Sequence, residues 1–200
     1  MNRKGRPGDR WMIAGLCAWF LVVAAAMGGL WRYKTTAGEP SRAPSMFPSA
    51  SRLAREHDRP LLLMFAHPQC TCTRASFAEL RVLMNEFQGR VTAHVVFLAG
   101  GGDTGSWSAS DSRGLARSIE GVRVEEDRDG TEASMFGAAT SGSVLLYGRD
   151  GRLLFHGGIT GARGHVGDNP GRDELTHLLR GDTTAAAPTP VFGCSLRDPT

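Results

Sequence analysis

Residues 11–31 form one apolar run without a charged side chain, and this run limits the fold more than any other feature of the chain. At a rise of about 1.5 Å per residue, a helix of this length spans the roughly 30 Å hydrocarbon core of a bilayer. The run is therefore expected to be a transmembrane anchor. Pro-containing segments at 32–48 and 184–200 leave one domain over residues 49–183, which is long enough for a single sizeable core.

Basic residues flank the apolar run unequally, with more of them on its N-terminal side. The positive-inside rule therefore predicts that residues 1–10 are cytoplasmic and that the domain lies on the periplasmic side of the inner membrane, held by an extended linker over 32–48. A cleavable signal peptide is the alternative, because Ala24–Ala26 offer small residues for cleavage. The basic residues are Arg3, Lys4, Arg6 and Arg10 before the run, and Arg32 and Lys34 after it.

The charge of the domain excludes a broad nucleic-acid interface. Residues 49–183 hold 15 Arg, no Lys and 17 Asp plus Glu, so the domain carries a net charge of −2. Proteins that bind nucleic acid across a wide face need an excess of basic residues, because the phosphate backbone dominates that affinity. The overall apolar content of 41% also argues against a disordered chain.

The first half of the domain has the pattern of a parallel βαβ unit. Residues 61–66 are a continuous apolar run, which is typical of a strand covered on both faces. Apolar residues from Phe77 to Phe87 then recur at helical spacing, and a second apolar strand follows at 91–98. A strand, a helix and a second strand in this order predict a parallel crossover.

The second half of the domain predicts an antiparallel hairpin. Two strand-like runs, 143–147 and 152–156, flank a Gly-Arg-Asp-Gly turn. The predicted fold class is therefore α/β, with a mixed sheet that is flanked by helices. The remaining expectations are helices at 51–57, 112–119, 131–138 and 173–180, a strand at 122–125 and a loop at 100–110.

Cys70 lies where the first strand gives way to a helix. The free N–H groups and the positive end of a helix stabilise a thiolate and lower its pKa, so a thiol at this junction is expected to be reactive. Arg74 adds positive charge, Pro68 stiffens the turn, and His67 is a candidate proton shuttle. The alternative is a buried structural cysteine, against which stands a second cysteine, Cys72, in the same polar turn.

Two other cysteines are candidates to react with Cys70. Cys72 is two residues away, and residues i and i+2 of a helix do not face one another, so a Cys70–Cys72 disulfide needs non-helical backbone. Cys194 follows Val191 and Phe192 in the C-terminal tail, and this apolar pair predicts that the tail folds back onto the domain beside Cys70 and Cys72. Cys194 then either joins a thiol relay or forms a single structural clip.

The order of elements, with cysteines after the first core strand, resembles the thioredoxin superfamily over about residues 60–195. The stretch 126–157 resembles its membrane-tethered TlpA-like and peroxiredoxin-like members. More narrowly, three blocks resemble the RedB-type thioredoxin-fold proteins. These blocks are His-Pro-Gln-Cys-Thr-Cys-Thr-Arg-Ala-Ser at 67–76, Gly-Ile-Thr-Gly-Ala-Arg-Gly-His-Val-Gly-Asp-Asn-Pro-Gly-Arg at 158–172, and Thr-Pro-Val-Phe-Gly-Cys at 189–194.

The resemblance implies that Cys70 is the attacking cysteine, and it also marks two departures. Thioredoxins use Cys-x-x-Cys, whereas here Thr73 stands at the position of the second cysteine. Thioredoxins also place a cis-proline before the hairpin, to present backbone to a substrate; here Gly142 stands at that position. Glycine permits unusual backbone angles, and a cis bond is not expected without proline.

These features lead to one principal functional hypothesis. The chain is expected to be a membrane-tethered, extracytoplasmic thiol–disulfide oxidoreductase without a cofactor, acting on protein thiols or disulfides. Cys70 attacks, and Cys72 or Cys194 resolves the mixed disulfide. The polar loop 161–172 either forms a wall near the cysteines through Arg163 and His165 or is simply solvated.

Two other functions are compatible with the same residues. A copper-binding metallochaperone or redox sensor of the Sco type would use Cys70, Cys72 and either His165 or His67 as ligands, because soft thiolates and an imidazole suit Cu(I). Sco-type proteins space their cysteines more widely. A peroxidase is the third option; peroxiredoxins carry a Thr three residues before the reactive cysteine, where this chain has His67.

Overall fold

The computed structural model describes residues 7–99, 111–182 and 187–196. It divides into two compact units, residues 1–36 and residues 37–200. The first unit is helix α1 (Pro7–Thr35). Its segment Arg10–Thr35 is long and apolar enough to cross a membrane, and none of its most apolar window is buried within the protein. Length and composition thus agree with the anchor or signal sequence expected here.

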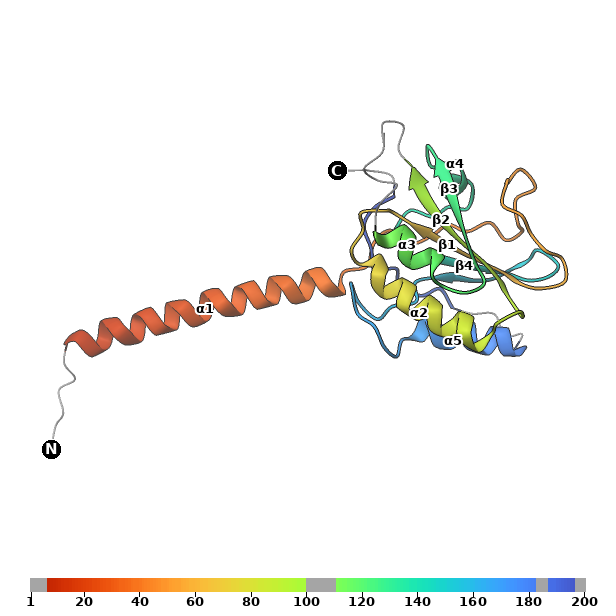
Figure 1. The fold of residues 1–200 in the computed structure, drawn as a ribbon. Coiled ribbons are helices and arrows are strands. Elements are labelled where there is room, and N and C mark those ends of the chain that lie inside the picture. Colours follow the sequence, from red (N-terminus) through yellow and green to blue (C-terminus); the bar gives the residue numbers. More distant parts are fainter. Residues whose placement is uncertain (1–6, 100–110, 183–186, 197–200) are drawn as a thin grey trace. The chain divides into compact units, whose positions relative to one another are not determined.

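The second unit is built on one mixed sheet of five strands in the order β3-β2-β1-β4-β5 (Figure 1). β1 pairs in parallel with β2, and β2 with β3, whereas β4 runs antiparallel to both β1 and β5. The predicted α/β class, with a parallel half and an antiparallel hairpin, is confirmed. The strands are β1 (Leu61–Ala66), β2 (Thr92–Ala99), β3 (Val122–Arg128), β4 (Ser143–Tyr147) and β5 (Leu153–Gly157).

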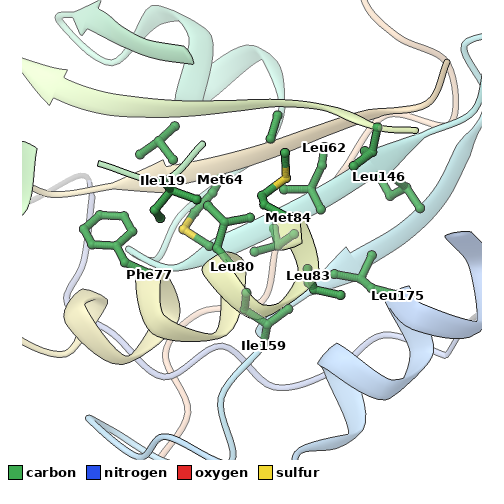
Figure 2. Packing of buried hydrophobic residues seen from close by; sticks show 14 of the residues in the cluster. Leu62, Met64, Phe77, Leu80, Leu83, Met84, Ile119, Leu146, Ile159 and Leu175 are labelled. Carbon is green, nitrogen blue, oxygen red and sulfur yellow. The ribbon is translucent and has the colours of Figure 1, made fainter. Parts of the chain in front are cut away.

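Helices and irregular segments cover the two faces of the sheet. Alternate side chains of β1 point to opposite faces, so Leu62 and Met64 belong to one core cluster while Leu63 and Phe65 belong to the other. The first cluster packs against α2 and α5 (Figure 2) and includes Ala116 of α3, and the second includes Ala133 of α4. The helices are α2 (Thr73–Glu86), α3 (Asp111–Arg117), α4 (Thr131–Met135) and α5 (Pro170–Arg180).

Three segments outside the sheet were expected to form a helix, a tether and a loop. Residues 51–57 form no helix, because Glu132 accepts hydrogen bonds from the Ser51 hydroxyl at 2.7 Å and from the Arg52 N–H at 3.1 Å and holds the chain extended. Residues 37–48 pack on the domain instead of standing off as a tether; for example, the Arg42 N–H donates to Gly137 at 2.9 Å. The loop expected at 100–110 lies outside the described residues.

The C-terminal tail lies against the domain, as the Val-Phe pair predicted. Val191 is 2% exposed and Leu196 is 5% exposed. The backbone of Thr140 pairs with that of Ser195 in an isolated antiparallel bridge. The globular unit therefore extends at both ends beyond the 49–183 that composition suggested, and it brings residue 194 next to the turn that follows β1.

Candidate functional site

The turn between β1 and α2 sets the position of Cys70. The backbone N–H of Cys70 donates to the carbonyl of His67 at 3.1 Å, and the N–H of Thr73 donates to the carbonyl of Cys70 at 3.1 Å. Cys72 is the N-cap residue of α2 and has helical backbone angles. The turn thus places the Cys70 side chain at the carboxyl end of β1, beside the first residue of α2.

Ser141 is the polar centre of this site. It lies just before β4, and its hydroxyl oxygen accepts the His67 N–H at 2.8 Å. The same oxygen is 2.8 Å from the hydroxyl of Thr73, and both hydroxyl groups hydrogen-bond to the sulfur of Cys70. Each hydroxyl has one proton, so one of them donates to the sulfur while the other donates to its neighbour or also to the sulfur.

The tail supplies two further donors to Cys70. The backbone N–H and the thiol of Cys194 both act on Cys70 as donors that lower its pKa. The carbonyl of Cys194 accepts the Ser141 N–H at 2.8 Å, and this bond fixes the tail beside the site. Cys194 itself stays exposed at the surface, whereas Cys70 is only 1% exposed.

The surroundings of Cys70 favour its ionised form. Burial alone raises the pKa of a thiol, but the hydrogen bonds from Thr73, Cys194 and Ser141 outweigh it and lower the pKa of Cys70 below its ordinary value. Cys70 is therefore buried among polar donors and not in apolar packing. The helix start was the expected source of this effect; the structure adds donors from two distant segments.

The other two thiols near Cys70 are held protonated. Although Cys194 as a whole is exposed, partial desolvation of its thiol and the hydrogen bond to Cys70 raise the pKa of Cys194 to about 12. Burial and the neighbouring Cys70 also raise the pKa of Cys72, although the guanidinium of Arg163 opposes this effect. Arg163 further donates to the carbonyl of Gly193 and so links the loop 161–172 to the tail. The structure thus brings Cys70, Cys72, Cys194 and Arg163 together.

The remaining predicted residues differ in their burial and in their contacts. Pro68 is buried in the turn, and Arg74 is exposed on the first turn of α2. The ring Nδ1 of His67 accepts the Gln69 N–H at 3.2 Å, and burial lowers the pKa of His67, so the ring is neutral and tied to the turn. His165 is exposed on its loop.

Copper binding would need Cys70, Cys72 and either His165 or His67 in one cluster. Within the part of the chain that the structure describes, no group of three or more His, Cys, Asp or Glu side chains is positioned to hold a metal ion. His165 therefore does not join Cys70 and Cys72 in such a group.

Gly142 holds Ser141 in place. It has a φ of +91°, a region that favours glycine, and its N–H donates to the carbonyl of Phe65 at 2.7 Å. No cis peptide bond occurs among the described residues. The sequence analysis predicted Gly142 as the site residue of this loop and missed Ser141, whose hydroxyl contacts Cys70. The one available signal was its place directly before the glycine that stands where relatives have proline.

Comparisons with known proteins bear on the fold. No protein-family model matches the chain, and no curated protein matches it. A hypothetical protein from Sinorhizobium meliloti is 18% identical, with a TM-score of 0.58 over 81% of this chain and 94% of that chain. An uncharacterized conserved protein from Geobacillus kaustophilus is 16% identical, with a TM-score of 0.57 over 83% of this chain and 94% of that chain.

A more partial likeness is to a secreted disulfide oxidoreductase of Mycobacterium tuberculosis that is homologous to DsbE of E. coli. It is 15% identical and has a TM-score of 0.44 over 62% of this chain and 83% of that chain. The two likenesses with TM-scores above 0.5 support the fold of the domain, a mixed five-stranded sheet flanked by helices. At these identities the likeness concerns the fold alone.

Proposed function

We propose that this chain is a thiol–disulfide oxidoreductase in which Cys70 is the nucleophile and Cys194 is the resolving thiol. One observation carries the proposal: backbone hydrogen bonds hold the tail beside the buried Cys70, where the Cys194 thiol helps to lower the pKa of Cys70. The thiolate is the form of cysteine that attacks a disulfide, and a second thiol in contact is what a two-electron exchange needs.

The reaction has two steps, and each step breaks one sulfur–sulfur bond and forms another. The Cys70 thiolate attacks one sulfur of a partner disulfide; the second partner sulfur leaves as a thiolate and takes up a proton. Cys194 then loses its proton and attacks the Cys70 sulfur of the mixed disulfide, and the first partner sulfur leaves. The partner gains two electrons, and the protein is left with a Cys70–Cys194 disulfide.

The raised pKa of Cys194 gives this sequence an order. Part of the rise comes from the hydrogen bond and the charge of the Cys70 thiolate. That part ends when Cys70 enters a mixed disulfide and loses its charge. Cys194 is therefore hard to ionise while it lies beside the Cys70 thiolate, and it is easier to ionise beside a Cys70 that is part of a mixed disulfide.

Cys194 suits the resolving role better than Cys72. Cys72 also contacts Cys70, but it is two residues away in the chain, at the helical N-cap of α2. A disulfide requires the two Cβ atoms to approach within about 4 Å with a specific torsion, and a local helical backbone opposes this. Cys194 comes from a separate segment and has no such constraint.

The proposed location is outside the cytoplasm. Helix α1 has the length and composition of a single-pass anchor, and the basic residues before the apolar run favour a cytoplasmic N-terminus. Disulfides form and persist in the oxidising compartments outside the cytoplasm. The partners on this proposal are protein thiols and disulfides that the anchored domain meets there.

Reduction of insulin by the full chain in detergent tests this function. The Cys70→Ser variant should lose the activity, and the Cys194→Ser variant should accumulate a mixed disulfide that non-reducing electrophoresis detects. The Cys17→Ser variant is the matched control, because Cys17 lies in α1 and should behave like the wild type. If Cys70→Ser retains the activity of the wild type, the proposal is wrong.

A further inference from the structure

The C-terminal tail pairs with the domain as a short added strand. Thr140 and Ser195 form an antiparallel bridge. On either side of it, the Ser141 N–H donates to the Cys194 carbonyl and the Leu196 N–H donates to the Ala139 carbonyl, each at 2.8 Å. Backbone pairing of this kind depends little on side chains, so another extended chain is able to form the same bonds.

The paired tail also closes the route to Cys70. The N–H and the thiol of Cys194 both act as donors toward the Cys70 sulfur. Cys70 itself is only 1% exposed. A disulfide in a partner protein must bring one of its own sulfurs to the position that Cys194 now holds. The tail therefore has to leave before the partner enters.

Gly193 shows how closely the tail approaches the backbone of residues 139–141. A Cβ atom at this position would lie 1.9 Å from the carbonyl oxygen of Ser141 and 3.4 Å from the Cγ2 of Thr140. A backbone oxygen does not yield as the end of a flexible side chain does. The residue immediately before the cysteine in this paired strand must therefore be glycine.

We propose that residues 191–196 are a displaceable self-ligand, and that the partner replaces them strand for strand with an extended segment containing Gly-Cys. The backbone edge 139–141 pairs with this segment and selects the glycine. The inference rests on the proposed function, since the partner cysteine enters as one half of a disulfide. The Cys70 thiolate attacks that sulfur, and the other half leaves as a thiolate. The tail then returns as the partner segment leaves the 139–141 edge, and Cys194 resolves the mixed disulfide.

The first test releases the tail in the full chain. Gly193→Ala forces the tail away from Ser141, and Gly114→Ala is the matched control because a Cβ there meets nothing within 4 Å. The rate of Cys70 alkylation is measured across pH. The plateau rate at high pH reports how accessible the Cys70 sulfur is, and the midpoint pH reports its pKa and therefore the loss of the Cys194 donors. The plateau should rise roughly tenfold or more, because a sealed group reacts only during opening, and the midpoint should move to higher pH.

A second variant covers the case in which Gly193→Ala fails to fold. Leu196→Asp removes the buried apolar anchor at the other end of the tail without a backbone collision. It should raise the plateau rate in the same direction. If neither variant raises it above that of Gly114→Ala, the tail is not a displaceable cover and the inference is wrong.

The second test measures selection of the glycine. Two peptides, Val-Phe-Gly-Cys-Ser-Leu and Val-Phe-Ala-Cys-Ser-Leu, carry a 2-pyridyl disulfide on the cysteine, and release of pyridine-2-thione by a tail-released variant reports attack. The glycine peptide should react faster, and equal rates would overturn the selection. Failure of insulin reduction together with faster attack on the glycine peptide would count against the proposed function alone.

Discussion

Replacement of Ser141 by alanine removes the polar centre of the site without removing any sulfur. Its hydroxyl is hydrogen-bonded to the Cys70 sulfur and to Thr73, and it accepts the His67 N–H. We expect Ser141→Ala to raise the pKa of Cys70, because one of the donors that outweigh the effect of burial is lost. The thiolate fraction at neutral pH should fall accordingly.

The magnitude follows from the value of one hydrogen bond. A hydrogen bond to a charged group contributes about 1.5–3 kcal/mol, and about 1.4 kcal/mol corresponds to a tenfold change in an equilibrium. The Thr73 hydroxyl, freed from its neighbour, turns its proton to the sulfur and offsets part of the loss. The lower end of the range is therefore expected, a roughly tenfold slower alkylation of Cys70 at neutral pH. The unpaired His67 N–H should also cost about 1–3 kcal/mol of unfolding free energy.

The assay is the rate of Cys70 alkylation across pH, with unfolding in urea measured on the same samples. Ser143→Ala is the matched control, since this buried hydroxyl bonds to the Thr140 carbonyl and to Ser41 without contacting Cys70. The control should lose stability and keep the wild-type midpoint. A Ser141→Ala protein whose Cys70 titrates as in the wild type would refute the reasoning.

Three further changes have defined outcomes. Relative to Cys70→Ser, the stability of the reduced wild type to urea should rise with pH up to about 9.0, because Cys70 has a lowered pKa in the folded state. Above 9.0 this difference should fall, because the Cys70 thiolate, which the variant lacks, contributes to raising the pKa of Cys194 to about 12. The buried Glu79 carboxylate accepts hydrogen bonds from the Arg172 guanidinium at 2.6 Å and from the Gly167 N–H at 2.7 Å. Glu79→Ala should therefore destabilise the fold by about 3 kcal/mol in urea unfolding, because both donors lose their partner. Arg163→Gln should further raise the pKa of Cys72 and slow its alkylation as followed by mass spectrometry.

The main elements of the fold were predictable because each has its own local pattern. β1 is a run of six buried apolar residues, and α2 buries Phe77, Leu80 and Leu83 at helical spacing. The Gly-Arg-Asp-Gly turn between β4 and β5 is equally local. These features identified both halves of the sheet and placed Cys70 at the strand–helix junction.

The parts that sequence reasoning missed depend on contacts between distant residues. Residues 51–57 do not form a helix because a carboxylate some 80 positions later binds their backbone and hydroxyl groups. Ser141 reaches Cys70 only when the sheet pairs β1 with β4. The one sequence signal for that contact is the place of Ser141 directly before Gly142. The tail was predicted to return, but its backbone pairing with 139–141 was not.

The central claim is that Cys70 and Cys194 form the redox couple of this protein. The most direct measurement is peptide mapping by mass spectrometry after the reduced full chain is oxidised with glutathione disulfide and blocked under non-reducing conditions. The account predicts one dominant cross-link between the peptides of Cys70 and Cys194, with Cys72 recovered as a blocked thiol. A dominant Cys70–Cys72 disulfide, or Cys70 recovered unoxidised, would contradict it.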